Sequence, residues 1–104
     1  MAEHFTRRLG TRGGRDYELT IRVSPSFDRV NDFAVIVHYT SNTPSEREVQ
    51  IARIDTTHGY THFDRLYRRA QPKERIDVDV WEAAALLEAN WRTYAESFDA
   101  LHGE

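Results

Sequence analysis

The amino-acid sequence predicts a single α+β domain, an antiparallel sheet of about four strands with one long C-terminal helix packed on it. Three observations carry this prediction. Apolar and polar residues alternate over 17–23, an almost unbroken apolar run occupies 33–39, and apolar residues recur at helical spacing from residue 80 onward. The 104 residues suffice for one hydrophobic core, so we expect a single domain over 1–104.

Composition narrows the class of protein. The chain has no cysteine, so disulfides and thiolate metal sites are excluded, and any metal would need histidine and carboxylate ligands. We expect neither a metal nor a cofactor. A net charge of -3 does not mark a polycation drawn to nucleic acid. No apolar run approaches the length of a membrane span, so we expect a cytoplasmic protein without membrane contact.

Residues 1–15 indicate a basic, glycine-containing arm that need not be ordered. Four of the arginines of the chain gather there. They are Arg7, Arg8, Arg12 and Arg15. Because the arginine fork binds phosphate through two parallel hydrogen bonds, the arm is a candidate phosphate-binding segment. The alternative is an arginine-favouring codon bias, since all basic residues except Lys73 are arginine.

The first two predicted strands follow the arm. In 17–23, Leu19, Ile21 and Val23 share one face opposite a polar face, as in a half-buried strand. The next strand, 33–39, is apolar at nearly every position, as in a central strand covered on both faces. One helix covers only one face of a sheet. Either the sheet curls around the helix or a partner covers its back.

A second hairpin completes the predicted sheet. The segments 48–55 and 60–68 flank a turn at Gly59, and the polar stretch 69–75 then crosses over to the helix. No linker, repeat or low-complexity segment divides the chain.

The helix is predicted over 80–102 by apolar residues at alternating steps of four and three. They are Val80, Ala84, Leu87, Trp91, Tyr94, Phe98 and Leu101. Asp79 stands at the N-cap with Glu82 three residues later, the pattern of a capping box, and Gly103 can end the helix.

Such a helix is roughly 35 Å long, whereas strands of seven residues span only about 23 Å. The helix should therefore project beyond its sheet and present Trp91, Tyr94 and Phe98 to an interface. This predicts a homodimer or a protein partner. The alternative is that the sheet curls around the helix, assisted by the N-terminal arm.

The candidate site lies in the second hairpin. A four-residue loop at 56–59 would place Asp55 opposite Tyr60 and Arg53 opposite His62. One face of the hairpin then collects polar side chains. They are Arg53, Asp55, His62 and Asp64, with His58 at the turn and Arg65 next along the chain.

Four interpretations of this group stay open. The first is an ion network on a solvated face. The second is acid–base chemistry on RNA, in which His58 or His62 moves a proton, an aspartate orients it, and Arg53 or Arg65 stabilises charge on phosphorus. The third is a metal site, although the familiar paired-histidine zinc spacing belongs to a helix. The fourth is local chemistry of the turn, with polar side chains bonding the backbone.

The layout of these segments resembles that of small TumE-like proteins, which are associated with a class of prokaryotic toxin–antitoxin modules. The matching residues are Gly14, Tyr39, Arg53, Asp55, His58, Gly59 and His62. Thr56 and Asp64 depart from the pattern, in which asparagine and a further histidine are common. The resemblance implies a small α+β protein that is encoded beside a DNA-binding antitoxin and acts on RNA.

Two classes of function follow. In the first, a toxin-like protein acts on RNA through the histidine-containing hairpin. In the second, the chain is a non-catalytic interaction module or homodimer that works through its helix and the back of its sheet.

Overall fold

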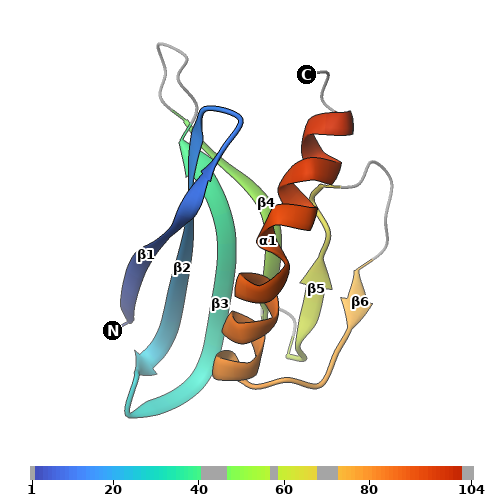
Figure 1. The fold of residues 1–104 in the computed structure, drawn as a ribbon. Coiled ribbons are helices and arrows are strands. Elements are labelled where there is room, and N and C mark those ends of the chain that lie inside the picture. Colours follow the sequence, from blue (N-terminus) through green and yellow to red (C-terminus); the bar gives the residue numbers. More distant parts are fainter. Residues whose placement is uncertain (1, 41–46, 57–58, 68–72, 102–104) are drawn as a thin grey trace.

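The computed structural model describes residues 2–40, 47–56, 59–67 and 73–101 of the chain. Within them lie six strands and one helix (Figure 1). The strands are β1 (Glu3–Arg12), β2 (Arg15–Ser26), β3 (Arg29–Thr40), β4 (Glu48–Asp55), β5 (His62–Asp64) and β6 (Glu74–Arg75), and the helix is α1 (Val80–Leu101).

The strands form one antiparallel sheet in which each pairs with its neighbours in sequence, in the order β1 to β6. This confirms the predicted α+β class and the single C-terminal helix packed on the sheet. The predicted number of about four strands is wrong, because the described residues contain six. The two additional strands are the two edges of the sheet.

The first edge strand, β1, corresponds to the segment expected to be a basic arm. It pairs with β2 from Glu3 opposite Val23 to Arg12 opposite Arg15. Gly13 and Gly14 connect the strands with φ values of 61° and 79°, as a tight two-residue hairpin turn requires. An edge strand needs no regular apolar alternation, which is why the sequence pattern did not reveal it.

The second edge strand, β6, lies in the stretch expected to cross over to the helix. It has only two residues, and it pairs through Arg75 opposite His62 and Glu74 opposite Phe63. Such a short pairing leaves no periodicity that a sequence can display.

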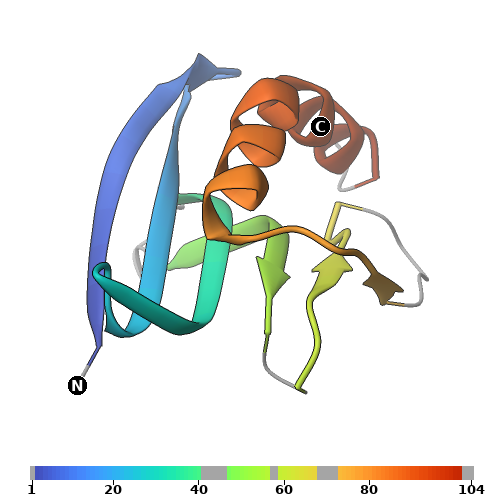
Figure 2. The same ribbon diagram turned by 90° about the horizontal axis from the view of Figure 1, so that it is seen from below.

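The sheet curls around the helix. Figure 2 shows β1 and β2 rising on one side of α1 and β4 to β6 passing beneath it toward the other. The face toward α1, here called the helix face, carries the core, and the opposite face is here called the outer face. Curling was one of the two alternatives that the sequence left open.

The expectation that the helix projects beyond its sheet is wrong. Strands β2 and β3 have twelve residues each, roughly 40 Å, whereas α1 has 22, roughly 33 Å. Trp91, Tyr94 and Phe98, predicted to form an interface, are therefore buried inside the chain, 3%, 7% and 8% exposed. Rings of the chain itself cover them. The centroid distances are 5.1 Å for Tyr17 and Trp91, 4.7 Å for Tyr67 and Tyr94, and 6.1 Å for Tyr39 and Phe98.

The start of the helix has the predicted capping box. The Glu82 amide donates to Asp79 Oδ1 at 2.8 Å, and the Asp79 amide donates to Glu82 Oε1 at 2.9 Å. The predicted last helical residue, His102, and the predicted C-terminal Gly103 lie outside the described residues. No helix within the described part of the chain has the length and apolar character of a membrane span.

Candidate functional site

The register of β4 and β5 sets the geometry of the candidate site. Asp55 lies opposite His62 and Arg53 opposite Asp64, whereas the predicted pairs were Asp55 with Tyr60 and Arg53 with His62. The connection is longer than expected because Thr56 continues toward β3, where its amide donates to the Phe33 carbonyl at 3.1 Å. A shift of two residues keeps every side chain on its predicted face.

Asp55 and His62 form the buried centre of the site. His62 Nε2 lies 2.8 Å from Asp55 Oδ1, and the two residues are 0% and 3% exposed, respectively. Arg53 Nε donates to the other carboxylate oxygen, Asp55 Oδ2, at 2.5 Å. Asp55 therefore joins an arginine and a histidine from adjacent strands, and it fixes the orientation of the imidazole ring.

Two further charged groups complete what we call the histidine cluster: Arg53, Asp55, His62, Asp64 and Lys73. Asp64 Oδ2 lies 3.8 Å from His62 Nε2 and 3.6 Å from Lys73 Nζ. Lys73 Nζ lies 3.4 Å from His62 Nε2. Nε2 can give a proton toward Asp55 or accept one from Lys73, but it cannot do both at once.

Lys73 is the member that sequence reasoning missed. It follows a proline and precedes β6, in a segment expected to be a crossover, and only the pairing of β5 with β6 returns it to the cluster. Its one distinguishing signal in the sequence is that it is the single lysine of the chain.

Arg65, predicted to join the site, does not. Its guanidinium lies over the Phe63 ring, 4.5 Å from the centroid, and pairs with Glu74. Phe63 belongs to the core on the helix face, so Arg65 lies on the opposite face of the sheet from His62. His58 lies outside the described residues.

The predicted phosphate-binding arginines of residues 1–15 do not converge on one surface. Arg7 pairs with Glu88 of α1, and Arg15 donates to Asp99 of α1 at 2.6 Å. Arg8 instead pairs with Asp16. Arg12 is half-buried. Because three of the four are paired with carboxylates of this chain, they stabilise the β1–β2 hairpin and its contact with the helix.

One of these pairs, Arg8 with Asp16, changes the pKa of its carboxylate. Thr11 donates to Asp16 Oδ1 at 2.7 Å and Arg8 donates to it at 3.0 Å. The hydrogen bond from Thr11 and the charge of Arg8 hold the pKa of Asp16 below its usual range.

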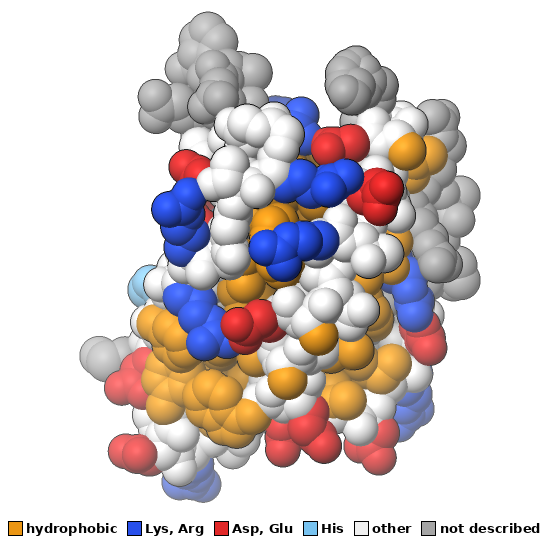
Figure 3. Space-filling model, viewed as in Figure 1, with side chains coloured by type: hydrophobic (Ala, Val, Ile, Leu, Met, Phe, Trp, Pro, Cys, Tyr) orange, Lys and Arg blue, Asp and Glu red, His pale blue; other side chains and the backbone are white. Residues whose placement is uncertain are grey.

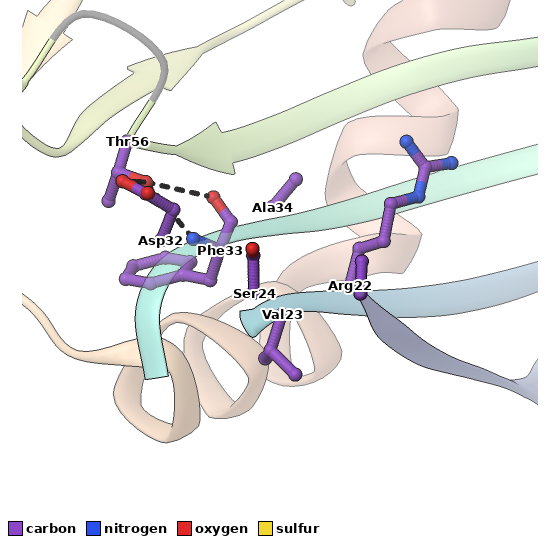
Figure 4. A pocket seen from close by; sticks show the side chains of 8 residues that line it. Arg22, Val23, Ser24, Asp32, Phe33, Ala34 and Thr56 are labelled. Carbon is purple, nitrogen blue, oxygen red and sulfur yellow. Dashed lines mark hydrogen bonds between the residues drawn. The ribbon is translucent and has the colours of Figure 1, made fainter. Parts of the chain in front are cut away.

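A hollow of about 260 Å³ adjoins the cluster on the outer face (Figure 4). Asp32, Phe33 and Thr56 stand at one end of it and Arg22 at the other. Ala34 also lines it and lies opposite Asp55 in the sheet. The hollow therefore extends the outer face from the histidine cluster toward Arg22.

A second hollow, of about 460 Å³, adjoins the cluster on the other side. It is lined by Gly59, Tyr60, Thr61, Arg75, Ile76 and Asp77. The Tyr60 ring lies 5.6 Å from the His62 ring, and the Arg75 guanidinium lies 5.0 Å from the Tyr60 centroid. Each hollow thus has an arginine beside it, and the histidine cluster lies between them.

The donor set of the cluster suits proton transfer, because groups that can donate and accept protons lie side by side. In the described part of the chain, no group of three or more histidine, aspartate or glutamate side chains is arranged to hold a metal ion. The cluster instead has two carboxylates, one imidazole and two cations within contact of one another.

The fold and the site define a class: a small α+β protein whose curled meander sheet carries a buried carboxylate–histidine cluster on its outer face. The family model DUF7718, described as a domain of unknown function, matches residues 1–104, and the chain belongs to this family. A search of curated proteins found no match, and neither did a search of solved structures. Nothing in the family match links the chain to TumE-like proteins.

Proposed function

We propose that this protein acts on RNA, as the resemblance to TumE-like toxins implies, and that its outer face holds the phosphodiester backbone at the histidine cluster. One observation carries the proposal. The buried Asp55–His62 pair contacts two partly exposed cations, Arg53 and Lys73, and together with Asp64, whose Oδ2 lies 3.6 Å from Lys73 Nζ, it holds both cations in fixed positions at the surface. Preorganised cations of this kind stabilise the charge that develops on a reacting phosphate.

The burial of each group assigns its role. The side chain of His62 is 1% exposed, whereas those of Arg53 and Lys73 are 30% and 48% exposed. Arg53 and Lys73 are therefore the groups that contact phosphate. His62 is a positioning residue behind them, and its contact with Lys73 gives a path for a proton between the two side chains.

The reaction class that suits these groups is RNA cleavage by its own 2′-hydroxyl. The 2′-hydroxyl gives its proton to a solvent water and its oxygen attacks phosphorus, and the bond to the 5′-oxygen breaks as that oxygen gains a proton, which leaves a 2′,3′-cyclic phosphate and a 5′-hydroxyl. Lys73 is placed to give this proton, since its side chain is partly exposed and its Nζ lies 3.4 Å from His62 Nε2. Arg53 stabilises the negative charge on the phosphoryl oxygens.

The length of the face suits an extended polyanion. Arg22, Ala34, Asp55, His62 and Arg75 follow one another across β2 to β6 in a single register row. Four strand spacings separate the two arginines, about 19 Å. Tyr60 is 38% exposed beside Arg75 and gives a surface on which a base can stack.

Binding to RNA tests the phosphate contacts. A fluorescently labelled single-stranded RNA should bind with a logarithmic salt slope of about -3, as expected for four contacts. Lys73→Gln and Arg53→Gln should each reduce the slope by about 0.7. Arg29→Gln removes the same charge at an exposed position at the start of β3 and should leave the slope unchanged. Equal effects of all three changes would show that only total charge matters, against the proposal.

Activity is tested by induced expression in a bacterial host, with growth and total RNA followed together. Wild type should arrest growth and degrade RNA, and Lys73→Gln or the double change His58→Ala/His62→Ala should abolish both effects at equal soluble protein level. RNA loss that persists in these variants would remove the histidine cluster as the active site. Healthy cells with intact RNA would remove the RNA-acting function altogether.

The second class of function, a protein-interaction module, has separate support. The predicted interface residues are buried, but Phe5 and Trp81 remain 39% and 52% exposed. Both lie away from the histidine cluster, on β1 and at the start of α1.

A further inference from the structure

We propose that two copies of this chain associate by antiparallel pairing of their β1 strands. Strand β1 has ten residues and pairs with β2 on one side; no other strand of the described residues pairs with its second side. Backbone donors and acceptors along a strand of this length form a template for another strand.

The opposite edge of the sheet is protected in the usual ways. Strand β6 has only two residues, and Lys73 and Arg75 bring positive charge to it. Short, charged edges discourage pairing with another chain. The long β1 edge is therefore the one suited to continuing the sheet.

An aromatic group lies beside the β1 edge. The ring of Phe27 is 5.5 Å from that of Phe5 and 5.9 Å from that of Trp81. In Figure 3 hydrophobic side chains gather at the lower left, over β1, the β2–β3 turn and the start of α1. An exposed aromatic group next to an unpaired edge is typical of an interaction surface.

The sequence of β1 identifies a second copy as the occupant, because the strand is self-complementary. With a two-fold axis at Phe5, each Glu3 lies opposite Arg7 of the other copy, and the two Phe5 rings meet on the helix face. Opposite charges and aromatic pairs in directly opposed positions stabilise antiparallel strands. An axis at Arg7 would place the two Arg7 side chains opposite each other, so like charges disfavour that register.

The side chains of this register are already held on the correct face. Glu3 Oε1 accepts a hydrogen bond from the Phe27 amide at 2.7 Å, and Arg7 pairs with Glu88 of α1. A carboxylate has several acceptor positions, so Glu3 can also receive Arg7 of the second copy. The histidine cluster lies on β4, β5 and the residue before β6, so this pairing leaves it uncovered. The inference is therefore independent of the proposed action on RNA.

The absence of cysteine allows a direct test by single-cysteine cross-linking. In the proposed register the two Phe5 Cα atoms lie about 5 Å apart, within disulfide range, whereas the two His4 Cα atoms lie about 8 Å apart. Phe5→Cys should therefore form a covalent dimer under mild oxidation, and the neighbouring His4→Cys should not. Equal cross-linking of both variants would reflect random collision and would overturn the register.

Sedimentation equilibrium tests the association without a cross-link. The wild-type chain of 12.2 kDa should sediment as a dimer at tens of micromolar concentration. Glu3→Arg, which opposes Arg7 with another arginine, should weaken dimerisation at least tenfold while the far-UV circular dichroism spectrum stays unchanged. A monomeric wild-type protein at 100 µM, or a Glu3→Arg variant that dimerises as well as wild type, would overturn the proposal.

Discussion

Asp55 and His62 face each other across β4 and β5, with Oδ1 of the carboxylate 2.8 Å from Nε2 of the imidazole and both residues buried. Arg53 occupies the second oxygen of Asp55. A buried carboxylate with two such partners couples the stability of the sheet to the geometry of the candidate site. Removing one member leaves the others desolvated and incompletely paired.

Asp55→Asn should accordingly lower the free energy of unfolding by about 3 kcal/mol, because it removes the charge that Arg53 and His62 share. Asp64→Asn is the matched control: its side chain is 16% exposed and lies 3.8 Å from His62 Nε2, so we expect a loss of about 1 kcal/mol or less. Urea unfolding followed by tryptophan fluorescence measures both. Similar losses for the two variants would mean that the Asp55–His62 contact contributes no more to the free energy of unfolding than the Asp64–His62 contact does.

Alanine substitution of the two tryptophans of α1 should have opposite effects on stability, large at one and small at the other. Trp91 is 3% exposed and its ring lies 5.1 Å from that of Tyr17, so Trp91→Ala opens a cavity, which costs about 3 to 5 kcal/mol. Trp81 is 52% exposed, and Trp81→Ala should change the free energy of unfolding by about 0.5 kcal/mol or less. Thermal unfolding of both variants makes the comparison. A small loss of stability in Trp91→Ala would contradict the burial of this side of α1.

A close approach between β1 and α1 gives a third prediction. A Cβ atom added at Gly10 would lie 3.0 Å from Trp91 Cζ2, whereas one added at Gly14 would meet nothing within 4 Å. Both glycines have positive φ. Gly14→Ala should therefore show backbone strain alone, about 1 kcal/mol, and Gly10→Ala should cost about 1 to 2 kcal/mol more.

A double-mutant cycle checks the cause of that difference. In a Trp91→Ala background the added methyl group at position 10 has space, so the excess cost of Gly10→Ala should disappear. An excess that persists without the indole would place its origin in the backbone of β1.

Alkaline pH should destabilise the protein through Tyr94. Burial, together with the nearby Tyr67, raises the pKa of Tyr94 to about 12. Between the unfolded pKa near 10 and this value, the folded state holds the proton that the unfolded state has lost, so stability falls as pH rises. Urea titrations at pH 8 and pH 11 should show that wild type loses about 1 kcal/mol more than Tyr94→Phe does. An equal loss in both proteins would rule out Tyr94 as the cause.

The sequence was a good guide wherever periodicity reports burial. The helix and the alternating faces of β2 followed from apolar spacing, and the capping box followed from the spacing of Asp79 and Glu82. The shared face of Arg53, Asp55 and His62 followed from the alternation of side chains in a hairpin. Side-chain alternation survives an error of two residues in register, which is why the face was correct although the pairs were not.

The failures have a common physical origin in backbone pairing that leaves no pattern in side chains. Strand β1 is held by its ladder to β2 and by ion pairs such as Arg7 with Glu88, neither of which requires apolar alternation. Strand β6 is too short to show any period. Missing these two edges made the sheet too narrow and hid Lys73 from the site. The helix seemed too long for its sheet because the predicted strands have seven residues, whereas β2 and β3 have twelve each.

The order of elements bears on how the chain folds. Every strand pairs with its neighbour in sequence, and the helix that covers their shared apolar face follows all six described strands. During synthesis each hairpin can close as soon as its second strand leaves the ribosome. The aromatic core side chains of β2 and β3, however, stay exposed to solvent until α1 emerges. The chain is therefore most prone to aggregation after the last strand has emerged and before the helix has. A chain released at residue 79 would stay in this aggregation-prone state.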